Sequence, residues 1–502
     1  MKEKNENRLK YSLRLMTYMT LILSLSVMSD MAFAQQRSDL PSKPNILFII
    51  CDQFRYDCQG STNTIVKTPN LNKLVSEGMF FSNAFSPIPT CCPARQTLLS
   101  GLWPAQHKGL WNYDITLPVP HFDAHTWTED LSNDGYQMGY VGKWHVSPEK
   151  TPLNFGYEDY VSDDQYRLWR REQKLGNPIP AIDSNRWMGG EDPAPLAETH
   201  THWLAQKAIG LIEKYKKDGK PWNVVLSLSE PHLPCNPVKR FVDMYDTSLI
   251  KPWGNFPDPF INKPYIQKQQ LYNWGLEDYT WRQWAVYVQH YYAMISQADD
   301  AIGTVLDALK KMGLDKNTVI IFTADHGDAG GSHGMIDKHY VMYEEEVHVP
   351  LVIKWDGIIK QGSRCDKFII NGLDLSATIP EIAGFKFMQS KGRSLVPLLR
   401  GNQVEDWRKF AFSNYNGQQF GLYTERMIRD NNMKYIWNLT DIDELYDLRN
   451  DPWEMKNLIA DPKYKDSLKY FRRELYKDLA TRHDPIINWV GKPQLLEGKK
   501  LE

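Results

Sequence analysis

The chain has 502 residues, of which 42% are hydrophobic and 24% are charged, and its net charge at pH 7 is −2. This composition is that of a globular protein, and the length allows one large domain with a smaller companion, or two to three ordinary domains. The near-neutral charge excludes the basic surface with which nucleic-acid-binding proteins hold their partner.

The first 34 residues have the three parts of a secretory signal peptide. Basic residues precede a short apolar stretch from Met16 to Met28, and Ala32-Phe33-Ala34 forms an A-x-A cleavage site. The apolar stretch is too short for a comfortable membrane span, and no cysteine follows it to carry a lipid anchor. We therefore expect residues 1–34 to be removed and the mature protein to be exported to a bacterial periplasm, with no stable membrane anchor.

Six cysteines are too few for a disulfide scaffold in a chain of this length. Cys91 and Cys92 are adjacent and poorly placed to pair with each other. An oxidising compartment permits a bridge between Cys51 and Cys58, which the sequence leaves open.

Buried strands and helices alternate between residues 43 and 385. Apolar, β-branched runs predict buried strands of a parallel sheet at Asn45–Cys51, Tyr140–Gly142, Asn223–Ser229, Thr318–Thr323 and Pro350–Trp355. Helical patterns lie between them at Leu71–Glu77, Thr126–Asp134, Thr201–Tyr215 and Trp281–Met312. This alternation predicts an α/β domain in which helices cover both faces of a large, mostly parallel sheet. Segments 155–200 and 235–275 are rich in Pro, Trp, Asp and Asn, and we expect them to form loops over the cleft.

A smaller α+β subdomain is expected over residues 386–490. Short strand-like runs are followed there by one amphipathic helix, at Phe410–Tyr415, Met433–Asn438, Glu444–Leu448 and then Lys465–Arg482. Short strands that follow one another closely predict an antiparallel sheet.

Residues 91–95 read Cys-Cys-Pro-Ala-Arg. Pro93 suits the first turn of a helix, which puts Cys91 just ahead of a helix N-terminus, where free amides and the helix dipole favour an anion. Arg95 adds a positive charge one turn later. These residues alone leave two interpretations open, a site that meets an anionic substrate and a buried cysteine beside a structural arginine.

Metal-binding residue types follow two of the predicted strands. Asp52 and Gln53 come directly after the first strand, and Asp325 and His326 follow the strand Thr318–Thr323. A single aspartate at a strand end usually caps a helix. However, sites in open α/β sheets form outside the carboxyl ends of the strands, so these four residues can converge into an oxygen-rich shell for a divalent cation.

Cationic and proton-handling residues follow the other strands. Lys143-Trp-His145 and His232 each come after a predicted strand, and Lys338 comes shortly after the second metal-binding pair. A pocket with a metal, two lysines, an arginine and two histidines is suited to a tetrahedral oxyanion.

In this order the motifs resemble the formylglycine-dependent type I sulfatases of the alkaline phosphatase superfamily. The pattern C-x-P-[S/A]-R-x-x-x-x-[S/T]-G spans Cys91 to Gly101, and the match continues in order from residue 43 to about residue 460. It also includes Asn45–Asp52, Gly142-Lys-Trp-His145, Pro231-His232, Thr323-Ala-Asp-His-Gly327, Lys338…Tyr343-Glu-Glu and Glu444-Leu-Tyr-Asp-Leu…Asp451-Pro-Trp-Glu454. The resemblance implies an alkaline-phosphatase-like fold and a secreted bacterial carbohydrate sulfatase.

The resemblance also implies how the nucleophile and the metal are supplied. A maturation enzyme oxidises Cys91 to formylglycine (3-oxoalanine), whose hydrate provides the attacking hydroxyl. Asp52, Gln53, Asp325 and His326, together with residue 91, hold one divalent cation, usually Ca²⁺. The sulfated gem-diol can lose sulfate by elimination, whereas the sulfate ester of an ordinary serine or cysteine has no such exit.

The remaining implied roles concern the sulfate and the protons. Arg95 supports the formylglycine, and Lys143 and Lys338 grip the sulfate. His232, together with Lys338, protonates the leaving alcohol, and His145 assists elimination of sulfate from the covalent intermediate.

Two positions depart from a common family pattern. Many members have a second Asp where this chain has Gln53, and Asn where it has His326. Both changes lower the charge of the ligand set, and nitrogen ligation leaves Mn²⁺ and Zn²⁺ open beside Ca²⁺.

Two alternative functions share parts of this pattern. A phosphonate monoester or phosphodiester hydrolase of the same superfamily can share the Cys-x-Pro-Ala-Arg run and the Asp-Gln start, but such relatives generally lack the Lys-x-His element present here as Lys143-Trp-His145. A non-catalytic protein that binds sulfated glycans would not need the intact nucleophile and both histidines.

The expected substrate is a sulfated oligosaccharide or polysaccharide, such as a glycosaminoglycan fragment, a mucin O-glycan or an algal polysaccharide. Asn236, Trp253 and Asn414–Gln419 are candidates for the pocket rim, although ordinary loop structure explains them equally well. The sulfated ring position and exo- or endo-action stay open.

Overall fold

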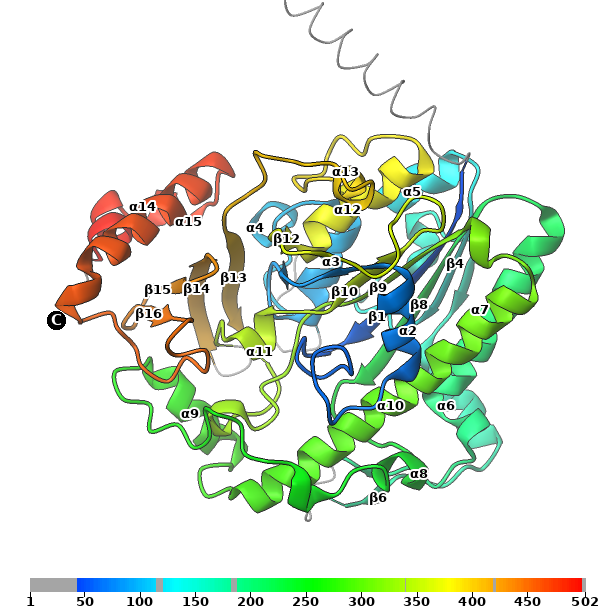
Figure 1. Ribbon diagram of the computed structural model, residues 1–502, viewed down its shortest axis with the longest axis horizontal. Coiled ribbons are helices and arrows are strands. Elements are labelled where there is room, and N and C mark those ends of the chain that lie inside the picture. The colour runs from blue at the N-terminus through cyan, green and yellow to red at the C-terminus, as the bar shows by residue number, and fades with distance from the viewer. Residues whose placement is uncertain (1–42, 114–120, 182–186, 339, 419–420, 499–502) are drawn as a thin grey trace, which may run out of the picture.

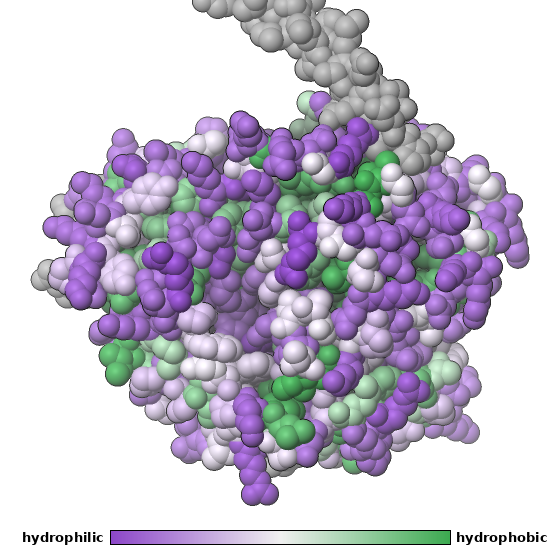
Figure 2. All heavy atoms as spheres, in the orientation of Figure 1, coloured by the Kyte–Doolittle hydropathy of each residue, from purple (hydrophilic) through white to green (hydrophobic). Residues whose placement is uncertain are grey.

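The computed structural model describes residues 43–113, 121–181, 187–338, 340–418 and 421–498 (Figure 1). The predicted signal peptide, residues 1–34, lies outside these ranges. None of the helices in the described ranges is both long and apolar enough to cross a membrane. The face shown in Figure 2 is mostly hydrophilic, with apolar residues in scattered patches, as expected for a globular protein.

One eight-stranded sheet organises the larger part of the chain, in the order β11-β2-β10-β9-β1-β8-β4-β5. Its four central strands, β9, β1, β8 and β4, run parallel and are almost entirely buried. They are rich in Val, Ile and Leu because both faces of the sheet are covered. The strands are β1 (Asn45–Asp52), β2 (Met79–Phe81), β4 (Gln137–Gly142), β5 (Asp159–Val161), β8 (Trp222–Pro231), β9 (Thr318–Ala324), β10 (Leu351–Lys354) and β11 (Ser363–Cys365).

Two groups of helices cover the sheet, and Figure 1 shows α2, α7 and α10 together on one side. These helices are α2 (Pro69–Glu77), α7 (His200–Asp218) and α10 (Trp281–Lys311), and the second group is α3 (Cys91–Ser100), α5 (Trp127–Asn133) and α12 (Asn371–Ala383). The predicted α/β architecture is therefore confirmed. The other α-helices described in this part of the chain are α4 (Pro104–His107), α6 (Asp163–Glu172), α8 (Lys239–Val242), α9 (Tyr265–Trp274), α11 (Glu344–Val347) and α13 (Val396–Leu399). Two small two-stranded sheets pair β3 (Ala84–Phe85) with β12 (Ile369–Ile370) and β6 (Ile179–Pro180) with β7 (Gly190–Glu191).

The prediction that Pro350–Trp355 forms a parallel strand is wrong. Strand β10 runs antiparallel to both of its neighbours, β9 and β2. Between β9 and β10 the described residues, 325–338 and 340–350, form only short helices and no crossover helix. A parallel strand needs a crossover to the opposite edge of the sheet, so without one the chain turns back antiparallel.

The expectation of loops over 155–200 and 235–275 is wrong in part, because α6 and α9 lie within these segments. Helix α6 begins with a capping box, in which Ser162 accepts a hydrogen bond from the backbone of Gln165 and the Gln165 side chain accepts one from the backbone of Ser162. The Ser-x-x-Gln signature of this cap was present in the sequence.

The C-terminal region contains the predicted antiparallel sheet and helix. The sheet has the order β13-β14-β15-β16, and α14 packs against it. Its elements are β13 (Ala411–Gln418), β14 (Gly421–Arg429), β15 (Met433–Asn438), β16 (Glu444–Asp447), α14 (Lys465–Thr481) and α15 (Ile486–Trp489). Strand β14 was missed because Glu425, Arg426 and Arg429 interrupt its apolar pattern, although all three are buried. The division of the chain at residue 385 stays a prediction.

All six cysteines of the sequence lie in the described ranges, and all are buried free thiols. The bridge between Cys51 and Cys58 that the sequence left open is therefore absent.

A buried ion cluster joins the C-terminal sheet to the segment that follows β9. Lys434 of β15 is fully buried, lies 2.8 Å from a Glu344 carboxylate oxygen and 2.7 Å from one of Glu454, and donates to the Met342 carbonyl at 2.8 Å. Burial opposes ionisation of Glu344, but Arg429 and Lys434 hold its pKa well below the usual value. The cluster therefore ties three distant segments together through one lysine.

We expect Lys434→Met to lower the free energy of unfolding by about 3–5 kcal/mol, because it leaves carboxylates buried without their cation. Denaturant titration measures the loss. The matched control is Lys477→Met, which removes a 60% exposed lysine paired with Glu474 and should change stability by less than about 0.5 kcal/mol. Equal effects in the two variants would contradict this role of Lys434.

His107, at the end of α4, is buried in its neutral form. Its Nδ1 accepts a hydrogen bond from the Gly109 backbone N–H at 3.1 Å, and its Nε2 lies 2.9 Å from Thr97 Oγ1. Burial lowers the pKa of His107 to about 3. If Nδ1 were protonated, its N–H would face the Gly109 backbone N–H, and this hydrogen bond would be lost.

Because the unfolded chain protonates His107 near about pH 6.5, this residue's contribution to stability is complete above that pH and is lost as the pH falls towards 3. Between pH 7 and pH 5 the loss should be about 2 kcal/mol. Urea titrations at both pH values should show a smaller decrease in the free energy of unfolding for His107→Gln than for wild type. The same decrease in both proteins would rule out this linkage.

Candidate active site

Four adjacent strands bring the predicted site residues to one edge of the sheet. Asp52 is the last residue of β1, and Lys143, His232 and Asp325 directly follow β4, β8 and β9. The predicted convergence at the carboxyl ends of the strands is confirmed. Cys91 reaches the same point from the N-terminus of α3.

Cys91 is the first residue of α3, with Thr90 as the N-cap, so it lies one residue further into the helix than expected. Its Sγ is 3.1 Å from His326 Nε2 and 3.5 Å from Asp52 Oδ1. Burial, reinforced by Asp52, raises the pKa of the Cys91 thiol to about 12. The thiol is therefore protonated at neutral pH and is not an activated nucleophile in this form.

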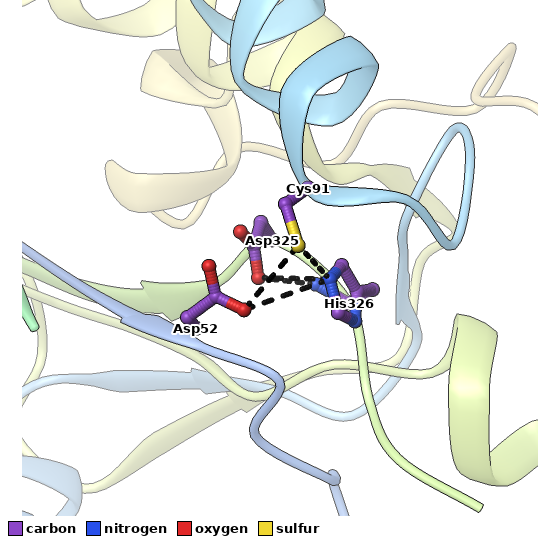
Figure 3. A group of neighbouring side chains, drawn as sticks. All are labelled: Asp52, Cys91, Asp325 and His326. Atoms are coloured by element: carbon purple, nitrogen blue, oxygen red, sulfur yellow. Dashed lines mark hydrogen bonds and ion pairs between the residues drawn. The ribbon is translucent and has the colours of Figure 1, made fainter. Parts of the chain in front are cut away.

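The four side chains in Figure 3 point towards one another from the end of β1, the start of α3 and the segment that follows β9. Ligand atoms of Asp52, Cys91, Asp325 and His326 all lie within 4.8 Å of one another. His326 Nδ1 lies 2.8 Å from the Gly327 carbonyl. A carbonyl can only accept, so the ring proton is on Nδ1 and the Nε2 lone pair faces the two carboxylates, 3.7 Å from each. Carboxylate oxygens with one imidazole nitrogen fit a divalent cation.

Arg95 bridges the two carboxylates. Its guanidinium lies 3.0 Å from Asp52 Oδ2 through Nη2 and 2.9 Å from Asp325 Oδ2 through Nε. Its remaining donor, Nη1, reaches Ser227 Oγ at 2.9 Å and the Lys143 carbonyl at 3.1 Å. Burial opposes ionisation of Asp52, but Lys143, whose Nζ is 2.7 Å away, and Arg95 hold its pKa well below the usual value. Both carboxylates are thus fixed by a cation that is itself buried.

Lys338 and His232 form a close pair beside this group. Lys338 Nζ is 2.6 Å from His232 Nε2, and His232 Nδ1 is 2.6 Å from the Leu233 carbonyl. The proton of neutral His232 is therefore on Nδ1, and its Nε2 accepts from the Lys338 ammonium. Burial, together with Lys338 and Lys143, lowers the pKa of His232 to about 3. Lys338 also forms a 2.9 Å ion pair with Asp337.

Gln53 links the carboxylate group to Lys338. It has a positive φ of 64°, its backbone N–H donates to Asp325 at 3.1 Å, and its Oε1 accepts from Lys338 at 2.8 Å. Its amide nitrogen donates to Asp328, a residue that sequence reasoning missed. Burial raises the pKa of Asp328 to about 7. The sequence did offer one indication that Asp328 belongs to the site, because it lies two residues after His326 in the segment that follows β9.

His145 is half-buried and follows Lys143 in a tight turn. Gly142 begins this turn with φ of 103°, and a Cβ there would lie 1.9 Å from the Ser227 carbonyl oxygen. Only glycine fits, and the turn brings the His145 ring edge-on to Tyr113 at 4.8 Å. Burial and Lys143 lower the pKa of His145 well below its usual value.

A pocket of about 580 Å³ opens beside Lys143 and His232. Asn236 lines it, as the sequence suggested. Trp253 instead packs under the guanidinium of Arg55 at 4.4 Å, and Asn414 accepts a hydrogen bond from Arg482 at 2.9 Å. The pocket also contains charged residues that were not singled out from the sequence, namely Asp163, Arg167, Arg170, Asp192, His200 and Glu230.

Comparison with known proteins identifies the family of the chain. The family model described as Sulfatase matches residues 44–385, and a second model, N-sulphoglucosamine sulphohydrolase, C-terminal, matches residues 331–481. An arylsulfatase of Clostridium perfringens is 28% identical, over 88% of this chain and 95% of its own length. An N-acetylglucosamine-6-O-sulfatase of Bacteroides thetaiotaomicron is 25% identical, over 96% of this chain and 95% of its own. The crystal structure of a phosphonate monoester hydrolase of Agrobacterium radiobacter matches with a TM-score of 0.74 at 24% identity, over 88% of this chain and 96% of its own, which shows a shared fold.

We expect Arg95→Met to lower the free energy of unfolding by about 3–5 kcal/mol, because it leaves Asp52 and Asp325 buried without their bridging cation. Arg167→Met is the matched control, since Arg167 is 63% exposed and paired with the exposed Asp164, so its loss should cost at most about 1 kcal/mol. Thermal and denaturant unfolding measure both. If Arg95→Met were as stable as wild type, the bridge would not contribute to the free energy of unfolding.

Proposed function

The chain belongs to the sulfatase family and is a hydrolase of sulfuric esters, and from this premise we propose that it removes sulfate from a sulfated carbohydrate. The proposed nucleophile is formylglycine made from Cys91, supported by one divalent cation. The observation that carries the proposal is the position of Cys91, buried against two carboxylates and an imidazole and surrounded by the cations of Arg95, Lys143 and Lys338.

The residues around Cys91 fit a divalent cation. Asp52, Asp325 and His326 would hold it together with residue 91, and the carboxylate donors favour Ca²⁺. Gln53, the fifth predicted ligand, directs its Oε1 to Lys338 and its amide nitrogen to Asp328. When present, the cation would supply positive charge against the sulfate, and formylglycine would supply a hydrated aldehyde whose hydroxyl attacks sulfur. The raised pKa of the Cys91 thiol supports a precursor role, since an unmodified thiol would be a poor nucleophile here.

The remaining residues bind the sulfate and move protons. Lys143 and Lys338 carry positive charge close to residue 91 and would neutralise charge on the transferring sulfate. The Lys338 ammonium donates a hydrogen bond to His232 Nε2 across 2.6 Å, and His232 also lines the pocket, so this pair can pass a proton from Lys338 to the leaving alcohol there. His145, neutral and two residues beyond Lys143, is proposed to accept the proton released at residue 91.

A carbohydrate substrate fits the pocket beside His232. Its volume of about 580 Å³ lies within the usual range of ligand sites, and most of its lining residues are polar or charged. The relative named as an N-acetylglucosamine-6-O-sulfatase supports this class. Export to the periplasm, directed by residues 1–34, and maturation by a formylglycine-generating enzyme complete the proposal.

The second candidate is a phosphonate monoester or phosphodiester hydrolase. The shared fold with the Agrobacterium enzyme and the Asp52-Gln53 pair favour it. The Lys143-Trp-His145 element favours a sulfate ester instead. The third candidate is a protein that only binds sulfated glycans. Such a protein would not need a lysine and a histidine paired for proton transfer, as Lys338 and His232 are.

Matured wild-type protein should release sulfate from 4-nitrophenyl sulfate or from a sulfated sugar. Cys91→Ala should lower kcat/KM by at least about a thousandfold, as expected when a nucleophile is lost. A chelator should abolish the activity, and added Ca²⁺ should restore it. Ion chromatography of free sulfate measures the product.

Sulfate release that survives Cys91→Ala would overturn the proposed nucleophile. Faster hydrolysis of a phosphonate monoester than of any sulfate ester would favour the second candidate. A wild-type protein that binds sulfated sugars without releasing sulfate would favour the third.

A further inference from the structure

The 580 Å³ pocket defines where the leaving alcohol lies. Lys143 and His232 line it, and each also contacts the group around residue 91: Lys143 is 2.7 Å from Asp52, and His232 is 2.6 Å from Lys338. A sulfate ester bound with its sulfur near residue 91 therefore extends its sugar past His232 into this pocket. This step rests on the proposed function.

The cations that line the pocket are already paired with carboxylates. His200 lies between Glu230, at 2.7 Å, and Asp163, at 3.2 Å, with one ring nitrogen towards each. Arg170 binds both oxygens of Asp192, at 2.7 and 2.8 Å. Since the ring nitrogens of His200 and the terminal nitrogens of Arg170 are engaged, neither is available for an anionic group on the sugar.

At the mouth of the pocket, Arg167 is paired with Asp164, and both are exposed. The remaining lining lysine, Lys143, faces Asp52 and the proposed sulfate position. Each cation among the described lining residues is therefore already paired with a carboxylate, and only the pair of Arg167 is exposed to solvent.

One carboxylate oxygen of a residue that lines the pocket, in contrast, is buried without a hydrogen bond among the described residues. Glu230 is 6% exposed, and its Oε1 takes the hydrogen bond from His200, while its Oε2 has no hydrogen-bond partner among the described residues. A buried acceptor without a partner is unfavourable, so a donor on a bound ligand gains the energy of that missing bond. Glu230 is the last residue but one of β8, the strand that His232 directly follows, and both residues line the pocket.

We propose that Glu230 determines specificity by accepting a hydrogen bond from a hydroxyl or amide N–H of the sulfated sugar unit. A second sulfate or a carboxylate at that position would face an unpaired carboxylate oxygen and no free cation, and is rejected. The substrate unit is therefore a neutral sulfated sugar, a hexose or N-acetylhexosamine, and not a uronate or a disulfated unit.

Asp163 and His200 hold Glu230 in place. Ser229 Oγ donates to Asp163 at 2.8 Å, and Asp163 in turn binds His200. Burial opposes a charge on His200, but Glu230 and Asp163 outweigh it and raise its pKa to about 10. The imidazolium thus keeps both contacts at neutral pH, and these two residues are positioning residues for Glu230.

The test compares monosulfated galactose and N-acetylglucosamine with their disulfated counterparts and with sulfated uronate disaccharides, using matured wild-type enzyme. The expected result is that kcat/KM for the best neutral sugar exceeds that of every doubly anionic unit by at least about a hundredfold. In Glu230→Gln this preference should shrink by about tenfold or more, mainly through KM for the neutral sugar. The loss should be larger for the sugar than for 4-nitrophenyl sulfate, which offers no hydroxyl to residue 230.

Glu213→Gln, on the exposed side of α7, is the matched control and should behave as wild type. Equal or better cleavage of uronate or disulfated units by wild type would overturn the proposal, whatever the variant does. If no sulfate is released at all, the proposed function fails. Calorimetric binding of the same sugars to Cys91→Ala then still decides the pocket claim, because tighter binding of doubly anionic sugars would refute it and tighter binding of neutral sugars would support it.

Discussion

Arg95 holds two buried carboxylates, Asp52 and Asp325, in one place, and the arrangement of the site depends on this contact. Like charges in a low-dielectric interior repel each other and favour protonation unless cations stand beside them. Arg95 satisfies one oxygen of each carboxylate from within the protein. The other oxygens, Asp52 Oδ1 and Asp325 Oδ1, remain directed to the side where Cys91 and His326 lie. The site is therefore charged, rigid and ready for a cation before any substrate arrives.

Charge is divided sharply between the two sides of His232. On the inner side, Lys143 and Lys338 face the carboxylates and the sulfur of Cys91, which suits a sulfate group. On the outer side, Arg170 and His200 are paired with carboxylates, and Glu230 Oε2 has no hydrogen-bond partner among the described residues. His232 and Lys143 take part in both environments, since each lines the pocket and contacts the inner group. The same division explains how one site could bind an anionic ester tightly and still reject a second anion close to it.

Much of the site could be read from the sequence, because its residues come directly after hydrophobic strands. Asp52, Lys143, His232 and Asp325 were found in this way, since parallel strands end at a common edge. Asp328 and Glu230 were not found, although each lies within two residues of a predicted site residue. Their importance comes from contacts with Gln53 and His200, which are far away in sequence and are set by packing. The direction of β10 was missed for a similar reason, since it depends on the path of the preceding loop and not on the composition of the strand.

The central claim is that Cys91 acts as a precursor and not as a thiol. Peptide mass spectrometry of residue 91 in catalytically active protein tests it most directly. Conversion of the thiol to formylglycine predicts a loss of about 18 Da, distinct from the mass gains of the ordinary oxidation states of cysteine. Protein made without the modifying enzyme should keep the thiol, fold normally and be inactive. An unmodified Cys91 in protein that hydrolyses sulfate esters would contradict the account.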